Sequence, residues 1–176
     1  MTQGEIIILR LLDTRSYYGY ELDKIIEENS MRRWADIGFS SIYNLLGRLE
    51  KKGLVTARFE KVHGSPKRKV YEITETGRKA LRKEVRRMLE SPADIHDDFT
   101  VGVVVSDVLD EEDFRLALRG YRSHLDARKQ FYETSMPDPV KQKPRVRLAF
   151  ERLRRLLEAE IRSEEHTSEL QSLLII

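Results

Sequence analysis

The stretch that decides the fold is SIYNLLGRLEKKGLVTARFE, residues 41–60. In its first half, apolar side chains recur at intervals of three and four from Ile42 to Leu49, which predicts an amphipathic helix that stops at Gly53. After Gly53 the pattern changes to alternation over residues 55–60, which predicts a strand. The row expected to be buried along the helix is Ile42, Leu45, Leu46 and Leu49.

Further elements are expected on both sides of this stretch. Thr2 and Glu5 have the spacing of a capping box and begin a helix over residues 3–12. Gly19 separates it from a second periodic segment, residues 20–28, and Trp34 is expected to be a core aromatic between that helix and the next one. Residues 70–73 are rich in β-formers and complete a hairpin. Thr74 then caps a helix that ends at Ser91.

The order of three helices, a hairpin and a fourth helix within residues 1–90 predicts a winged helix-turn-helix. Burial of the apolar row leaves polar side chains of the third helix facing outward. Asn44 and Arg48 have the donor and acceptor geometry for base edges, and hydroxyls and Lys51 suit phosphates. The outward residues are Ser41, Tyr43, Asn44, Gly47, Arg48 and Lys51.

The predicted hairpin has a basic tip. Gly64 and Pro66 predict a turn that holds several cations close together, so the hairpin can follow a DNA backbone or enter a minor groove. The side chains concerned are Lys61, His63, Lys67, Arg68 and Lys69. Coupled to the third helix, this tip favours double-stranded DNA as the partner.

Charge is distributed unevenly along the 176 residues. Residues 1–90 hold 19 Lys and Arg against 13 Asp and Glu, net +6, whereas residues 91–176 hold 13 against 17, net −4. The basic half is the candidate for a polyanionic partner. Cysteine is absent, which excludes disulfides and thiolate chemistry. No run approaches the roughly 18 apolar residues of a membrane span, so we expect a cytoplasmic protein without membrane contact.

The second half, residues 93–161, is expected to be helical and to mediate dimerisation. Residues 99–108 are β-branched, but a helix is favoured because no partner strand is visible. A helix with an acidic first turn follows Asp110 and ends at Pro137 and Pro139, and a last helix begins at Lys141. Two apolar seams exceed what one small unit can bury, which predicts a homodimer. The seams are Phe114, Leu118, Tyr121 and Leu125, and Val146, Phe150, Leu153 and Leu157.

The last residues, 162–176, are set apart from this scheme. The run RSEEHTSELQS, residues 162–172, resembles a one-frame translation of a widely used sequencing adapter. We therefore expect these residues to be an artefact that adds no stability, and they carry no functional interpretation.

Several short motifs resemble the PadR-like transcriptional regulators over residues 6–81. They are the stretches Ile8-Leu9-Arg10-Leu11-Leu12, Gly19-Tyr20-Glu21-Leu22, Ser41-Ile42-Tyr43, Leu49-Glu50, Gly53-Leu54-Val55, Lys67-Arg68-Lys69-Val70-Tyr71 and Ile73-Thr74-Glu75-Thr76-Gly77. Ser40-Ser41 stands where the family often has Gly-Thr. The resemblance implies a mainly α fold with a small β-hairpin, an N-terminal winged helix-turn-helix and C-terminal helices.

The resemblance also implies roles for individual residues. Ser40, Ser41 and Tyr43, at the start of the third helix, would meet the operator. Tyr20 would brace the motif or touch a phosphate, and residues 67–69 would form the wing contact. A repressor acting on a pseudo-palindromic operator is implied, and an unidentified small-molecule effector stays open as a further partner.

Other classes of function find little support. The four histidines are scattered, no phosphate-binding glycine loop precedes a helix, and no HExxH pattern occurs, so we expect neither an enzyme nor a cofactor. His96, Asp97 and Asp98 are adjacent in sequence and are better interpreted as a solvated helix start than as a metal site. A winged helix that binds protein instead of DNA remains the alternative, although such a module has no reason for so basic a wing.

Overall fold

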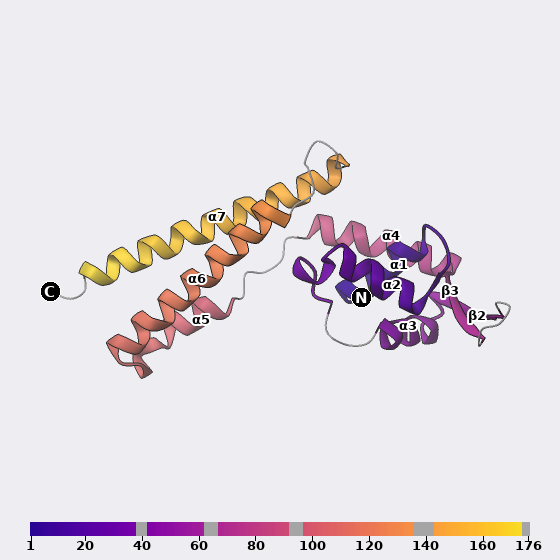
Figure 1. The fold of residues 1–176 in the computed structure, drawn as a ribbon, viewed down its shortest axis with the longest axis horizontal. Helices are drawn as coiled ribbons and strands as arrows, with labels where there is room; N and C mark the ends of the chain where they lie inside the picture. The colour runs from indigo at the N-terminus through magenta and orange to yellow at the C-terminus, as the bar shows by residue number, and fades with distance from the viewer. Residues whose placement is uncertain (38–41, 62–66, 92–96, 136–142, 174–176) are drawn as a thin grey trace. The chain divides into compact units, whose positions relative to one another are not determined.

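The computed structural model describes residues 1–37, 42–61, 67–91, 97–135 and 143–173. The chain divides into two compact units, Met1–Asp94 and Ile95–Ile176 (Figure 1). It is mainly helical with one small antiparallel sheet in the first unit, as the sequence predicted.

The first unit contains the expected order of helices, hairpin and helix, plus two short elements. Its elements are α1 (Gln3–Leu12), β1 (Tyr17–Tyr18), α2 (Gly19–Glu28), the 3-10 helix η1 (Met31–Arg33), α3 (Ile42–Lys51), β2 (Val55–Glu60), β3 (Arg68–Ile73) and α4 (Glu75–Glu90). Both predicted caps are present. Thr2 and Glu5 form a full capping box at α1, and the Thr74 hydroxyl accepts from the Gly77 N–H at α4.

The sheet has three strands in the order β1-β3-β2, so the hairpin has a further partner strand. Its register places Val55 opposite Ile73 on one side of β3, and Tyr17 opposite Tyr71 on the other. The strand β1 was not predicted, because two residues are too few to show an alternating pattern. It ties the start of α2 to the wing formed by β2 and β3.

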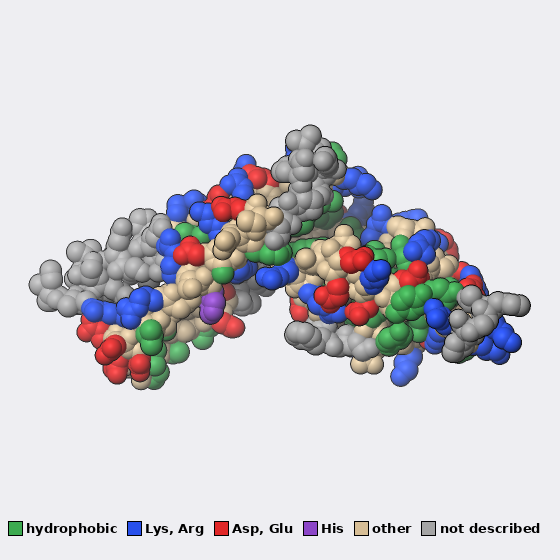
Figure 2. Space-filling model, in the orientation of Figure 1, with side chains coloured by type: hydrophobic (Ala, Val, Ile, Leu, Met, Phe, Trp, Pro, Cys, Tyr) green, Lys and Arg blue, Asp and Glu red, His purple; other side chains and the backbone are tan. Residues whose placement is uncertain are grey.

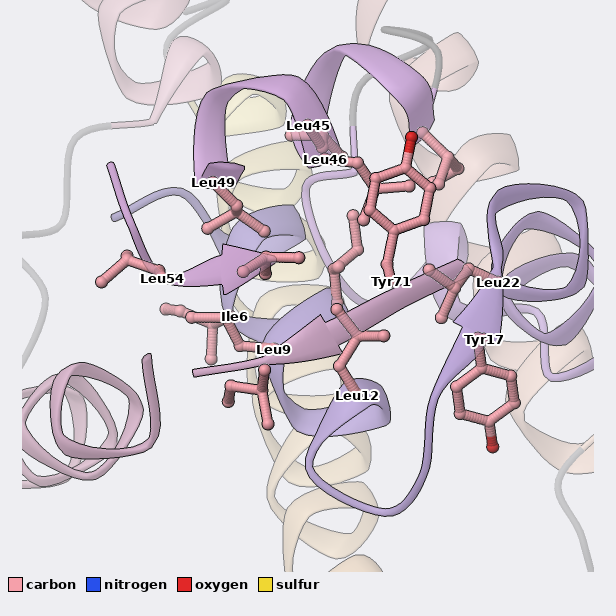
Figure 3. Close-up of a cluster of buried hydrophobic side chains, with 14 of the residues drawn as sticks. Ile6, Leu9, Leu12, Tyr17, Leu22, Leu45, Leu46, Leu49, Leu54 and Tyr71 are labelled. Atoms are coloured by element: carbon pink, nitrogen blue, oxygen red, sulfur yellow. The ribbon is translucent and has the colours of Figure 1, made fainter. Parts of the chain in front are cut away.

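A continuous apolar core joins α1, α2, α3 and the sheet (Figure 3). The predicted apolar row of α3 is confirmed, and all four of its side chains are buried. Tyr71 points from β3 toward α3 and closes the core on the wing side. The core fixes which face of α3 is turned away from the unit.

One tight contact holds α4 to the end of α3. A Cβ atom on Gly77 would lie 2.1 Å from the carbonyl oxygen of Leu54. Only glycine allows the first turn of α4 to approach that backbone so closely. Thr74 secures the same junction, because its hydroxyl donates to the carbonyl of Gly53.

One expectation about an apolar residue in this unit is wrong. Trp34 follows η1 and is 40% exposed, so it is not a core aromatic between α2 and α3. On α4, Leu81 is buried, whereas Val85, Met88 and Leu89 are exposed. The core ends before the last two turns of α4, and the apolar face continues beyond it.

The second unit consists of helices. These are α5 (Asp98–Val104), the 3-10 helix η2 (Ser106–Val108), α6 (Glu111–Ser135) and α7 (Pro144–Leu173). The preference for helix over strand within residues 99–108 is confirmed. Asp97 caps α5, and Asp110 accepts from the Asp113 N–H at the start of α6.

The last helix begins at Pro144, three residues later than predicted. Proline suits the first helical position, because its ring fixes φ and the missing N–H has no partner there. Pro137 and Pro139, expected to end α6, lie outside the described residues, and α6 itself ends at Ser135.

A small core joins α6 and α7. Leu125, Leu157 and Ile161 are buried, and Tyr121 and Tyr132 pack against them. The Tyr121 hydroxyl bonds to Glu160, and its ring stacks on Phe99 with the centroids 4.1 Å apart. Burial and the Glu160 carboxylate both raise the pKa of Tyr121.

Candidate nucleic-acid interface

The exposed side of α3 carries the residues predicted to read DNA. In a helix with 3.6 residues per turn, Asn44, Gly47 and Lys51 lie opposite the buried row, with Tyr43 on one flank and Arg48 on the other. Tyr43, Asn44, Arg48 and Lys51 are all exposed, and Gly47 is partly so. Ser40 and Ser41 lie outside the described residues. Because its apolar row is buried in the core, α3 turns a polar strip outward.

The Arg48 flank of α3 faces α1. Glu5 of α1 is 2% exposed, and its Oε1 accepts from Lys52 Nζ at 2.8 Å and lies 3.5 Å from Arg48 Nε. Its Oε2 accepts from the Thr2 N–H at 3.2 Å. Burial by itself raises the pKa of Glu5, but the bonds from Lys52 and Thr2 and the two nearby cations outweigh it and leave the pKa lowered.

The Tyr43 flank of α3 faces the start of α2. A Cβ on Gly19 would lie 2.5 Å from Cε1 of Tyr43, so the absence of a side chain at residue 19 lets the ring pack over the backbone there. The ring is still 56% exposed. Tyr43 is thus oriented by α2 and remains accessible.

The wing carries exposed cations of its own. Lys61, Lys67 and Arg68 are exposed, and Figure 2 shows Lys and Arg side chains gathered around the end of the β2–β3 hairpin. The predicted site residue His63 lies outside the described residues.

Lys69 occupies a different position from the rest of the predicted wing contact. Its Nζ lies 2.8 Å from Oε2 of Glu50 on α3 and 5.3 Å from the centroid of the Tyr71 ring. The hydrogen bond to Glu50 raises the pKa of Lys69. In this structure Lys69 therefore connects the wing to α3, and its predicted contact with a phosphate stays a prediction.

Tyr20 lies where α2 and the wing meet. Its ring stacks on Tyr18 with centroids 5.6 Å apart, and the Arg68 guanidinium lies 5.6 Å from its centroid. Arg68 Nη1 also lies 3.4 Å from the Tyr20 hydroxyl, and the Tyr18 hydroxyl donates to Glu60 at 3.0 Å. Tyr20 is exposed and contacts Arg68, and its two predicted roles, to brace the motif or to touch a phosphate, stay predictions.

The structure thus groups most of the predicted residues and adds four. Arg48, Asn44, Tyr43 and Lys51 share α3, while Tyr20, Lys61, Lys67 and Arg68 belong to the α2–wing side. The residues that sequence reasoning missed are Glu5, Glu50, Lys52 and Tyr18. Only Lys52 gave a signal, since it stands four residues after Arg48 and so shares a helix face with it.

Other kinds of site find no support among the described residues. No group of three or more His, Cys, Asp or Glu side chains there could hold a metal ion. In the same residues, no helix has the length and apolar character needed to cross a membrane.

Comparison with known proteins agrees with this architecture. The sequence model described as the transcriptional regulator PadR-like family matches residues 8–83. Protein X of Lysinibacillus sphaericus is 34% identical over 84 residues, which are 48% of this chain and 76% of that protein. The chain belongs to the PadR-like family of transcriptional regulators. By that membership it is a DNA-binding regulator and not an enzyme.

Solved structures are similar in fold to most of the chain. The Vibrio cholerae virulence activator AphA is 22% identical, with a TM-score of 0.72 over 97% of this chain and 99% of AphA. Bacillus subtilis PadR, crystallised with operator DNA, is 18% identical, with a TM-score of 0.71 over 94% of this chain and 97% of that protein. Protein smu.1604c of Streptococcus mutans is 21% identical, with a TM-score of 0.70 over 96% of this chain and 99% of that protein. At these identities the likeness establishes the fold, including the C-terminal helices.

Proposed function

We propose that this PadR-like regulator binds operator DNA as a homodimer, with α3 in the major groove and the wing on the adjacent backbone, and that it represses transcription. One observation carries the proposal: α3 turns a polar strip outward opposite a fully buried apolar row, and the wing, joined to α3 by the Lys69–Glu50 pair, carries exposed cations. A helix of this kind fits the major groove, and cations at its edge hold phosphates.

The individual side chains suit separate tasks. Asn44 can bond N6 and N7 on the major-groove edge of an adenine, and Arg48 can bond O6 and N7 of a guanine, because each side chain presents two polar atoms in the required geometry. The remaining cations suit phosphate oxygens. The ammonium groups of Lys51 on α3 and Lys67 on the wing act as single charges, and the guanidinium of Arg68 can donate two parallel hydrogen bonds. The crystallised complex of Bacillus subtilis PadR with operator DNA supports this mode of binding for the present chain.

The homodimer is supported by apolar surface that one copy leaves exposed. Leu116, Leu148 and Leu156 are 59%, 72% and 50% exposed, and they lie on the sides of α6 and α7 away from the core between these helices. Val101, Val104 and Val108 of α5 and η2 are exposed as well. Exposed apolar surface of this kind marks a protein interface.

The predicted dimerisation seams need revision in detail. Leu118, Leu125 and Leu157 are buried within a single chain, so their side chains are already used by the chain's own packing. Phe114, Tyr121, Val146, Phe150 and Leu153 are half-buried. We therefore place the interface on the opposite sides of α6 and α7, around Leu116, Leu148 and Leu156.

Selection of bound duplexes from a random pool, followed by fluorescence anisotropy at several salt concentrations, tests the proposal. A two-fold-related site should emerge, with half-sites about one helical turn or a multiple apart. Its affinity should exceed that of a scrambled duplex by about 10³-fold or more, and both affinities should fall steeply with salt. Absence of an enriched sequence together with salt-independent binding would instead favour a protein-binding winged helix.

A reporter gene behind the selected site tests the direction of regulation. Lower expression when the regulator is present is the expected result, since a dimer on the site would exclude other proteins from it. Higher expression would make the chain an activator and would leave the DNA-binding proposal intact.

A further inference from the structure

One buried carboxylate lies directly behind the reading face of α3. Glu5 is the only charged or polar residue among the described residues that is buried to the same degree as the apolar core, at 2% exposed. Glu5 belongs to α1 and is not part of the polar strip of α3. A single carboxylate oxygen of Glu5 nevertheless contacts two cations, Arg48 on α3 and Lys52 directly after it.

The capping box does not account for this arrangement. The Thr2 N–H takes up Oε2, and glutamine at this position would serve a capping box equally well. Oε1 points the other way, to Lys52 Nζ and Arg48 Nε. A buried charge is costly unless it is paired, so Glu5 depends on these cations, and they in turn are drawn toward α1.

The contact also restricts how Arg48 can meet DNA. The guanidinium approaches Glu5 through Nε, and Nε is not one of the two terminal amino groups that Arg uses in its paired contact with a guanine edge. A guanidinium drawn toward a carboxylate at one nitrogen loses less rotamer freedom when the other nitrogens bind, so it discriminates bases better than a guanidinium on an unrestrained side chain.

We propose that Glu5 is a positioning residue for DNA recognition: it orients Arg48 toward the base edges and withholds the charge of Arg48 and Lys52 from general attraction to phosphates. The inference rests on the proposed function of α3. Glu5 contributes to specificity in two ways, because it strengthens one base contact and weakens sequence-independent binding.

The substitution Glu5→Gln separates this role from a structural one. It keeps the shape and the capping bonds, removes one negative charge and releases both cations. The scrambled duplex should bind several-fold more tightly, with a salt slope steeper by about one unit, while the ratio of operator to scrambled affinity falls about fivefold or more. A purely structural Glu5 predicts weaker binding to both duplexes.

Two further variants provide controls. Asp13→Asn removes the same charge from the C-terminal end of α1, where Asp13 pairs with Arg78 of α4, and should leave the affinity ratio unchanged. The double variant Glu5→Gln/Lys52→Gln restores the net charge. Its scrambled affinity should return to the wild-type value while the ratio stays low, because Arg48 remains unrestrained.

Thermal melts of each variant ensure that only folded protein is compared. If Glu5→Gln fails to fold, the double variant is measured in its place. The double variant also removes the charge of Lys52, which would otherwise lie beside an uncharged side chain at residue 5. An unchanged affinity ratio in folded Glu5→Gln or in the folded double variant overturns the proposal. Failure of the wild-type protein to distinguish operator from scrambled duplex would instead overturn the proposed function, and the two failures are therefore distinguishable.

Discussion

The two units of this PadR-like regulator use their apolar residues differently. In the first unit, four helices and a three-stranded sheet share one core, and the wing and α3 are fixed to it. In the second, only Leu125, Leu157 and Ile161 are buried as one cluster, while several valines and leucines on α5, α6 and α7 are exposed. We therefore expect the first unit to fold by itself, and we propose that a second copy of the chain completes the second unit.

The electrostatic contrast follows the same division. Residues 97–113 contain seven acidic residues and no Lys or Arg, and Figure 2 shows acidic side chains clustered at the end of α6 that begins with Glu111. The wing and α3 carry exposed cations, and further Lys and Arg residues lie on α4 and α7. The acidic stretch at the start of the second unit is therefore the part of the chain that disfavours contact with phosphates.

The largest expected effect comes from disrupting the proposed dimer interface of the second unit. Leu148→Asp/Leu156→Asp places two charges on the exposed side of α7 and should yield monomers by sedimentation. Because a monomer engages one half-site, operator affinity should fall by about 10²-fold or more. His124→Asp, a charge at an exposed α6 position, should leave a dimer. An unchanged mass in the double variant would refute the interface, and Leu157→Asp should unfold the unit instead.

The next largest effect concerns the packing of α4 in the first unit. Gly77→Ala places a methyl group against the Leu54 carbonyl, so the first turn of α4 must shift, at a cost of about 1–3 kcal/mol. The melting temperature of the first unit should fall by about 4–8 °C per kcal/mol. Gly47→Ala is the matched control, since no atom lies within 4 Å of the added Cβ. That variant should be stabilised slightly, and equal melting of both would contradict the packing described.

A smaller effect depends on pH. The pKa of Glu5 is lowered in the folded chain from its ordinary 4.5, so its ionisation stabilises the fold above about pH 4.5 and this stabilisation is lost as the pH falls through the folded value. Urea unfolding of wild type and Glu5→Gln should therefore differ most near neutral pH and converge in acid. A stability difference that grows on acidification would show that the pKa is raised, not lowered.

The smallest effect is expected at the C-terminal end. The helix α7 runs to Leu173, and Ile161 is its last described core residue. If residues 162–176 are translated adapter, truncation after Ile161 should leave the melting temperature and the dimer unchanged. A loss of several degrees in calorimetry would show that these residues belong to the fold.

Sequence reasoning recovered the features that rest on periodicity and local caps. The buried row of α3, the change of period after Gly53, the Thr74 cap and the helix after Asp110 each depend on residues close together in the chain. These patterns were enough to predict the wing and the polar strip.

Features that depend on distant residues were missed. The burial of Glu5 requires α1 to meet Lys52, and the pairing of Lys69 requires the wing to meet Glu50. Trp34 looked like a core residue because composition cannot show where a core stops. The same limit put Leu157 at a dimer interface, although α6 of its own chain covers it.

The central claim is that α3 reads the operator while the wing holds the backbone, and one salt titration of two variants tests it most directly. Asn44→Ala should lose about 1–3 kcal/mol on the selected operator and little on a scrambled duplex, because it removes a base contact. Lys67→Ala should weaken both duplexes alike and reduce the salt slope by about one unit for each half-site. Equal losses on both duplexes for Asn44→Ala, with an operator-specific loss for Lys67→Ala, would contradict the assignment of the two elements.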